Sequence, residues 1–298
     1  MQMPNFSLAT TEDGSLSLHE TNLDELYHNR AGAFTEAITN YVEPAMQFLK
    51  LARAVGTVRP SLRVLDSCFG LGYNSLALAN SLASSNTDTS ADLSCGFNLQ
   101  VEGIELDPDV LAVVPQVLDQ DCFAALERQT LEQLNFKISV CDLRQFLLER
   151  ESSCLYDLIF HDPFSPKKVP ELWSVDLFQH YYLAMTEDSA LLTYACAPAV
   201  RGALISLGFK VFRTTGLGRK NGGTIAIKTS TQDLVQELLK VDNTCIFEIA
   251  GEELRRLGKS SQVPFRDPYL TDSRATILAR REAEQAEFRL SYLNNPGP

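Results

Sequence analysis

Hydrophobic residues along the chain occur in two alternating patterns. Short apolar runs of strand length are separated by segments whose apolar residues have helical spacing, which is typical of a parallel sheet covered by crossover helices. The predicted strands are residues 62–66, 97–105, 136–140, 155–160, 189–194, 209–213 and 224–228. The predicted helices between them are residues 73–82, 108–133, 142–150, 175–186 and 198–207. The pattern predicts an α/β fold with a mostly parallel sheet of seven strands.

Both ends of the chain lie outside this alternation. The N-terminal extension, residues 1–60, contains a predicted hairpin over residues 5–18 and a predicted helix over residues 32–55, and it is placed to cap the active face. The sheet and its helices occupy residues 61–230, and residues 231–298 form a C-terminal helical extension. We therefore predict a core with an addition at each end.

The composition is that of an ordinary globular protein, because 45% of the 298 residues are hydrophobic and 21% are charged. The formal net charge of −12 argues against non-specific binding of nucleic acid or anionic membranes. The acidity is concentrated in residues 1–200, which hold 11 basic and 27 acidic side chains, whereas residues 201–298 hold 15 and 11. A polyanion contact is therefore expected to be local.

The cysteines and the N-terminus indicate a cytoplasmic protein. The seven cysteines are at least 13 positions apart, so no Cys-x-x-Cys pair is present for zinc or redox chemistry, and the histidines show no metal spacing. No apolar run is long enough to span a membrane, and the first residues lack the pattern of a signal peptide. We expect no bound metal, no membrane association and a monomer.

A glycine turn follows the first predicted strand. In VLDSCFGLGYNS, residues 64–75, the strand ends at Asp66 and a helix begins after Gly70 and Gly72. Glycine lets the backbone approach a ligand, and a helix N-terminus offers free N–H groups. A dinucleotide fingerprint needs a third glycine where Ser75 stands, so nicotinamide binding is not supported. Because glycine also ends strands for structural reasons, the turn alone leaves ligand binding open.

Carboxylates follow the next two strands. Glu105 ends the second strand, where a carboxylate can accept hydrogen bonds from both hydroxyls of a ribose. Asp107 precedes a proline and is expected to cap the following helix. Asp142 follows the third strand, where it can accept a hydrogen bond from an adenine amino group or cap a helix, and both interpretations stay open.

The fourth strand delivers His161, Asp162, Pro163 and Phe164 to the carboxyl edge of the sheet, where ligands bind in open α/β folds. The Asp-Pro-Phe sequence resembles the Asp-Pro-Pro-Phe or Asp-Pro-Pro-Tyr turn of nitrogen methyltransferases. A carboxylate and a backbone carbonyl there can hold an amine by its hydrogens, while the aromatic ring packs on the substrate. Asp162 and Phe164 are therefore the candidate catalytic residues, and a purely structural turn is the alternative.

The block HDPFSPKKVPELWSVDLF resembles the Asp-x-Phe-x-Pro-x-Lys-x-Pro-x-x-Trp motif of a bacterial family, the methyltransferase module of the bifunctional tRNA 5-methylaminomethyl-2-thiouridine biosynthesis proteins, MnmC. The segments DELYHNRAGAFTEAITNYVEP, LDSCFGLGYNSLALA and GLGRKNGGTIAI also resemble it, in the family order, over most of residues 24–228. Pro163 departs from the family, which has Gly or Ala there. The chain is too short to hold the flavin-dependent oxidase of the bifunctional members, so a stand-alone methyltransferase is expected.

The resemblance implies a Rossmann-like class I S-adenosylmethionine-dependent methyltransferase fold. It also implies methyl transfer to the amine of 5-aminomethyluridine at the wobble position of tRNA. The S-adenosylmethionine contacts would come from Asp66, Gly70, Gly72, Glu105 and Asp142. The tRNA phosphates would be contacted by four cations near the catalytic turn, Lys167, Lys168, Arg219 and Lys220, although each of them can also be a solvated loop residue.

Two other functions compete with this hypothesis. An aminopropyltransferase that makes polyamines has the same fold and would suit the overall acidity. It typically carries an Asp-Ser-x-Asp-Pro turn after the fourth strand, however, and His161-Asp162-Pro163 lacks the earlier carboxylate. A non-catalytic tRNA-binding protein with a degenerate pocket would not bind the cofactor. The glycine turn, Glu105 and Asp162 argue against it.

Overall fold

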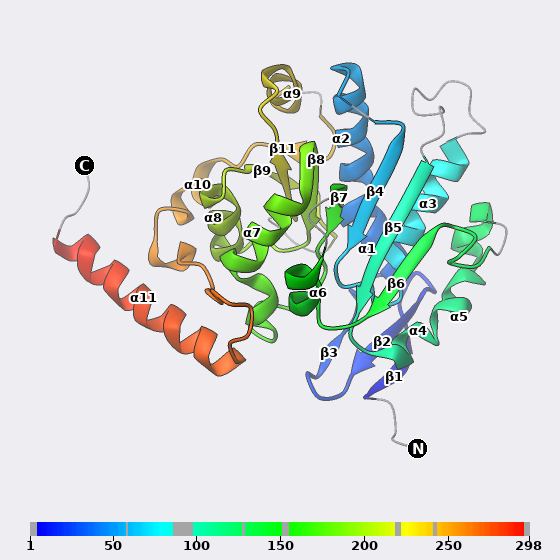
Figure 1. The fold of residues 1–298 in the computed structure, drawn as a ribbon, viewed down its shortest axis with the longest axis horizontal. Coiled ribbons are helices and arrows are strands. Elements are labelled where there is room, and N and C mark those ends of the chain that lie inside the picture. Colours follow the sequence, from blue (N-terminus) through cyan, green and yellow to red (C-terminus); the bar gives the residue numbers. More distant parts are fainter. Residues whose placement is uncertain are drawn as a thin grey trace.

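The central sheet has eight strands, in the order β11-β9-β10-β8-β7-β4-β5-β6 (Figure 1). The computed structural model describes residues 5–57, 59–85, 98–126, 129–150, 155–217, 222–240 and 243–294. The strands are β4 (Ser61–Asp66), β5 (Asn98–Glu105), β6 (Phe136–Val140), β7 (Tyr156–Phe160), β8 (Met185–Thr193), β9 (Lys210–Thr214), β10 (Thr224–Lys228) and β11 (Ile246–Phe247). All seven predicted strands are present. The eighth, β11, has two residues and therefore no recognisable alternation.

The order in which successive strands are added to the sheet reverses at β4. This strand pairs in parallel with both β5 and β7. From there β5 leads outward to β6 and β7 leads outward to β8, again in parallel, whereas β10 is antiparallel to β8 and β9. Ligands in such sheets bind at the carboxyl ends of the strands on either side of this reversal. The predicted α/β class with a mostly parallel sheet is confirmed.

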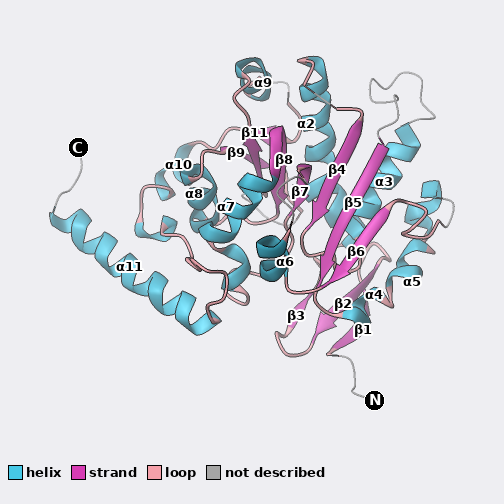
Figure 2. Ribbon diagram, in the orientation of Figure 1, coloured by secondary structure: helices cyan, strands magenta, loops and turns pink. Residues whose placement is uncertain are grey.

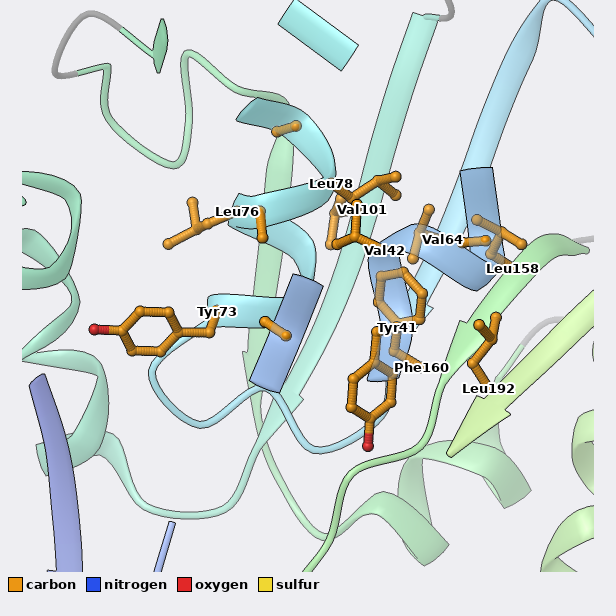
Figure 3. Close-up of a cluster of buried hydrophobic side chains, with 14 of the residues drawn as sticks. Tyr41, Val42, Val64, Tyr73, Leu76, Leu78, Val101, Leu158, Phe160 and Leu192 are labelled. Atoms are coloured by element: carbon orange, nitrogen blue, oxygen red, sulfur yellow. The ribbon is translucent and has the colours of Figure 1, made fainter. Parts of the chain in front are cut away.

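Helices cover both faces of the sheet (Figure 2). Side chains alternate across a strand, so Leu158 and Phe160 of β7 enter one hydrophobic core while Ile159 enters the other. The first core, shown in part in Figure 3, is completed by helices near the N-terminus, α1 (Ala33–Ala37), α2 (Glu43–Ala54) and α3 (Tyr73–Ser85). The second is completed by α6 (Leu143–Glu149), α7 (Val175–Ala184) and α8 (Pro198–Ser206).

The N-terminal extension forms a small three-stranded sheet of β1 (Phe6–Thr10), β2 (Leu16–Glu20) and β3 (Glu25–Leu26). The predicted hairpin is present, with β3 added to it. The single helix predicted over residues 32–55 is instead interrupted between α1 and α2 by a π-helical segment, η1 (Ile38–Val42). Pro44 explains the interruption, because it has no N–H to donate to the carbonyl four residues earlier.

The long helix predicted over residues 108–133 was wrong. The structure has two short helices, α4 (Pro108–Leu111) and α5 (Val114–Leu118), followed by a 3-10 segment, η2 (Asp121–Leu126). Pro115 lies at the start of α5 and prevents α4 from continuing.

The C-terminal extension contributes to both sides of the sheet. Its elements are α9 (Gln232–Leu238), the edge strand β11, α10 (Gly251–Arg256), η4 (Ser260–Gln262) and α11 (Arg274–Asn294). Helix α9 packs beside α2 in the first core, and the chain then returns to the side covered by α7, where Phe265 forms a bridge with Ser174. The buried carboxylate of Asp267 accepts a hydrogen bond from Arg144 of α6 at 3.1 Å, which ties the extension to the second core. No helix in the described ranges is long and apolar enough to cross a membrane.

Candidate active site

A cavity of about 480 Å³ opens at the carboxyl ends of the central strands. Five predicted site residues line it together, Gly70, Glu105, Asp142, Asp162 and Phe164. Its other wall is the segment between β2 and α1, residues 20–29, which we call the cap segment. In Figure 1 the small sheet that carries this segment lies at one end of the large sheet.

The glycine turn adopts a backbone conformation that side chains disfavour. Gly70 and Gly72 have φ angles of +53° and +80°. A Cβ atom at Gly72 would lie 2.5 Å from the Phe69 ring, so that ring can pack beneath the turn only because no side chain is present. The turn exposes the Gly70 backbone to the cavity, as required for a close ligand contact.

Glu105 joins this turn to the loop that follows β5. One carboxylate oxygen accepts a hydrogen bond from the Gly70 N–H at 2.8 Å, and the other accepts from Leu106 N and Asp107 N at 2.8 and 2.9 Å. Burial raises the pKa of the carboxyl, while these backbone hydrogen bonds oppose the rise. The next residue, Leu106, lines the same cavity and is 70% exposed, so it offers an apolar surface beside the carboxylate.

Asp66 and Gly72 do not line the cavity in the described structure. The Asp66 carboxylate is fully buried and accepts a hydrogen bond from Ser75 Oγ at 2.7 Å. Burial raises its pKa well above the usual range. The direct cofactor contacts of these two residues stay predictions, and what the structure shows is that Asp66 and Gly72 shape the turn and the start of α3.

The two aspartates after β5 and β6 both cap helices. Asp107 accepts a hydrogen bond from Asp109 N at 2.9 Å, as expected. Asp142 accepts from Arg144 N at 2.8 Å and also lines the cavity. Its capping role is thus observed, and its contact with an adenine group stays a prediction.

Asp162 lies where β7 ends and is held by a residue that sequence reasoning missed. Asn74, in the first turn of α3, donates a hydrogen bond from Nδ2 to Asp162 Oδ2 at 2.8 Å. Both side chains line the cavity. One feature of the sequence could have indicated this contact. Asn74 stands directly after the glycine turn, at the N-terminus of α3, and this end of the helix faces the carboxyl end of β7, the strand beside β4.

Phe164 faces an aromatic partner from the cap segment. Its ring and that of Tyr27 meet edge to face with centroids 5.0 Å apart, and both rings line the cavity. Burial, together with the nearby Glu105 carboxylate, raises the pKa of the Tyr27 phenol, so the hydroxyl stays protonated. Tyr27 was not predicted individually, although it lies in the N-terminal block that resembles MnmC.

The histidine before Asp162 does not line the cavity. His161 is fully buried, and its Nδ1 lies 3.1 Å from Ser67 Oγ and 3.0 Å from Tyr181 OH. Burial lowers the pKa of this imidazole to about 3, so the ring is neutral at physiological pH. Its ring packs the turn that carries Asp162 against Trp173 and Phe178.

The four predicted tRNA-binding cations differ in their surroundings. Lys167 is exposed, whereas the ammonium of Lys168 donates a hydrogen bond to the Leu23 carbonyl of the cap segment. Arg219 and Lys220 lie outside the described residues. Among the described side chains no group of three or more His, Cys, Asp and Glu residues is arranged to bind a metal.

The chain is similar to known methyltransferases in sequence and in structure. The profile of an S-adenosyl-L-methionine-dependent methyltransferase family matches residues 110–229. The crystal structure of MnmC2 from Aquifex aeolicus aligns with a TM-score of 0.72 and 26% identity, over 96% of this chain and 87% of that one.

Curated relatives agree with this alignment. The tRNA 5-methylaminomethyl-2-thiouridine biosynthesis bifunctional protein MnmC of a Marinomonas species is 24% identical over 78% of this chain. An uncharacterized protein of Methanocaldococcus jannaschii is 28% identical over 74% of it. The matched regions span only 35% and 59% of the lengths of these two relatives. Fold, glycine turn and family matches together show that the chain is an S-adenosylmethionine-dependent methyltransferase that resembles the methyltransferase module of MnmC.

Proposed function

We propose that this methyltransferase acts on the primary amine of 5-aminomethyluridine at the wobble position of tRNA. The observation that carries the proposal is that Asp162 lines the same cavity as Gly70 and Glu105, so an amine and the cofactor fit side by side. The proposal is supported by the MnmC relatives, whose names specify 5-methylaminomethyl-2-thiouridine in tRNA. A tRNA substrate would place the protein in the cytoplasm.

The residues around the glycine turn fit S-adenosylmethionine. Gly70 presents backbone without a side chain, Glu105 has a carboxylate for ribose hydroxyls, and Leu106 offers an apolar surface for a flat base. Asp142 would accept a hydrogen bond from the adenine amino group. When bound, the cofactor supplies an electrophilic methyl group on a sulfonium.

The other end of the site fits an amine on a flat base. Asp162 accepts hydrogen bonds from the neutral amine, and this orients the nitrogen lone pair toward the methyl group. After transfer, the same carboxylate can accept the proton that the methylated amine releases. Phe164 and Tyr27 offer aromatic surfaces to the uracil ring. Five further carboxylates line the cavity, against the single described cation Arg144, and favour a cationic group over an anionic one: Glu20, Glu25, Glu36, Asp107 and Glu171.

Nucleoside analysis of a deletion strain tests the proposal. We expect wobble 5-aminomethyl nucleosides to accumulate at the expense of 5-methylaminomethyl nucleosides, as measured by mass spectrometry. The purified protein should also transfer labelled methyl groups to tRNA that carries the aminomethyl group. In that assay Asp162→Ala should lower the rate about a hundredfold, while the exposed Asp109→Ala should not change it.

Three results would contradict the proposal. Wobble nucleosides that do not change in the deletion strain would exclude the tRNA substrate. Transfer to putrescine rather than to tRNA, in a parallel assay with labelled cofactor, would favour the polyamine function instead. Absence of cofactor binding in calorimetry would indicate the non-catalytic tRNA-binding protein.

A further inference from the structure

A tyrosine from the N-terminal extension lies directly behind the candidate catalytic carboxylate. Tyr41 is fully buried and packs edge to face on Phe160, the last residue of β7, as Figure 3 shows. Its hydroxyl donates a hydrogen bond to the His161 carbonyl at 3.4 Å and accepts the N–H of Tyr194 at 3.3 Å. Burial raises the pKa of this hydroxyl, and so do the charge of the nearby Asp162 carboxylate and its hydrogen bonding to the hydroxyl. Tyr41 is thus in contact with the chain directly before Asp162 and lies close to the Asp162 side chain.

The π-helical segment η1 explains how the tyrosine comes to lie there. Three successive residues of this segment, Asn40, Tyr41 and Val42, are buried, although successive residues of a regular α-helix point about 100° apart. The carboxamide of Asn40 accepts the N–H of Leu217 at 3.2 Å. This hydrogen bond holds the π-helical turn against the chain that follows β9. π-Helical turns recur at functional sites, where they direct a side chain that an α-helix would turn away.

We propose that Tyr41 is a positioning residue which, together with Asn74, fixes the Asp162 carboxylate in the orientation that receives the substrate amine. This inference rests on the proposed function, because it assigns Asp162 to the amine. It adds a residue from outside the sheet to a site whose other predicted members follow strand ends.

The hydroxyl of Tyr41 has a single proton, and we infer that the Asp162 carboxylate competes for it with the His161 carbonyl. The N–H of Tyr194 occupies a lone pair of the hydroxyl oxygen, so the proton has two acceptors, the Asp162 carboxylate and the His161 carbonyl at 3.4 Å. A charged acceptor forms the stronger hydrogen bond. Burial and the neighbouring carboxylate raise the pKa of Tyr41 well above its usual range, so the hydroxyl remains a donor throughout the working pH range.

The backbone of the turn is fixed by other side chains. Tyr194 donates from its hydroxyl to the Pro163 carbonyl at 2.9 Å, and Trp173 donates from Nε1 to the Phe164 carbonyl at 2.9 Å. Because these bonds hold the main chain, removal of the Tyr41 hydroxyl should release mainly the Asp162 side chain. Its loss is therefore expected to affect the reaction more than the fold.

Tyr41→Phe tests the proposal, because it keeps the packed ring and removes only the hydroxyl. We expect kcat for methyl transfer to fall about tenfold, while KM for tRNA and the affinity for S-adenosylmethionine stay within twofold of wild type. In an Asp162→Ala background the same change should cause no further loss. The matched control is Tyr156→Phe, which removes a buried hydroxyl bonded to the Glu102 carboxylate at 2.6 Å, at the opposite end of β7. The control should keep the wild-type kcat.

A second double-mutant cycle, on the unfolding equilibrium, needs no substrate. We expect Tyr41→Phe and Asp162→Ala to be coupled by about threefold or more in the unfolding equilibrium constant. Additive effects there, or a Tyr41→Phe protein with wild-type kcat, would overturn the positioning role. Wild-type protein that fails to methylate the tRNA would overturn the proposed function instead, and the unfolding cycle would still decide whether Tyr41 holds Asp162.

Discussion

The ammonium group of Lys168 donates a hydrogen bond to the backbone carbonyl of Leu23, which joins the loop after Asp162 to the cap segment. Ser165 Oγ, three residues earlier, donates to Glu25 Oε2 of the same segment at 3.4 Å. The side chain of Lys167 is exposed. Two adjacent lysines that were both predicted to contact phosphate therefore lie in different environments.

We expect the two lysines to respond differently to substitution. Lys167→Met should weaken tRNA binding and reduce the slope of log affinity against log salt by about one unit, because one phosphate contact is lost. Lys168→Met should leave that slope unchanged and instead lower the affinity for S-adenosylmethionine, because the cap segment that walls the cavity loses an attachment. Filter binding at several salt concentrations and calorimetry distinguish the two effects. A reduced salt slope in Lys168→Met would instead indicate that Lys168 contacts a tRNA phosphate.

Glu105→Gln should lower the affinity for S-adenosylmethionine at least about tenfold, since an amide cannot accept all three backbone N–H groups that the carboxylate binds. The loop after β5 and the glycine turn would then separate. Calorimetry with the purified protein measures the change. Glu102→Gln, on the same strand, is the control, because its carboxylate bonds Tyr156 instead of the turn. If both variants bind S-adenosylmethionine as tightly as the wild type, Glu105 does not contribute to cofactor binding.

The sheet was predictable because its strands are buried and short. Each apolar run stands between polar turns, and the seven predicted strands are all present. The errors arose where proline acts on a continuous apolar pattern, since Pro44 and Pro115 interrupt segments whose spacing alone indicates uninterrupted helices. The register of a two-residue strand such as β11 depends on its neighbours and leaves no local pattern.

The site was predictable only in part, and the reason is geometric. Glu105, Asp142 and Asp162 follow parallel strands, and such ends meet at one edge of a sheet wherever the intervening helices lie. Tyr41 reaches Asp162 across 121 positions of sequence, through a π-helical turn that no periodicity indicates. Asp66 shows a different limit of this reasoning. It also ends a strand, but its side chain points into the protein interior, and the side that a terminal residue faces depends on the local pleat.

Asp13→Ala should destabilise the N-terminal extension. The Asp13 carboxylate lies at the tip of the β1–β2 hairpin and accepts the N–H and hydroxyl of Thr35, at 3.0 and 2.7 Å, so it caps α1 from a distance in sequence. Loss of a helix cap costs about 1 kcal/mol, or roughly 2–4 °C in Tm for a protein of this size. Thermal unfolding measures it, with the exposed neighbour Glu12→Ala as control.

The same carboxylate should contribute to the loss of stability in acid. Burial opposes its ionisation, but hydrogen bonds from Ser15 and Thr35 outweigh that effect and hold the pKa of Asp13 well below its usual range. A group with a lowered folded-state pKa stabilises the protein above the unfolded-state pKa and loses this effect as the pH falls. The difference in stability between wild type and Asp13→Ala should therefore shrink below about pH 4. A difference that stays constant down to pH 2 would show that the charge has no role.

The buried imidazole of His161 should give the protein a second acid sensitivity at higher pH. Well above pH 6.5 the ring is neutral in both the folded and the unfolded state and has no effect on the pH dependence of stability. Below that value the unfolded chain takes up a proton that the folded protein refuses until about pH 3, so the free energy of unfolding decreases as the pH falls. One such group contributes a slope of up to about 1.4 kcal/mol per pH unit. Urea unfolding of wild type and His161→Gln between pH 7 and pH 4 should therefore show a shallower pH dependence in the variant, whatever its stability at pH 7. Parallel curves would mean that the ring takes up its proton while the protein is still folded, and that the packing around Trp173 and Phe178 opens before the molecule unfolds.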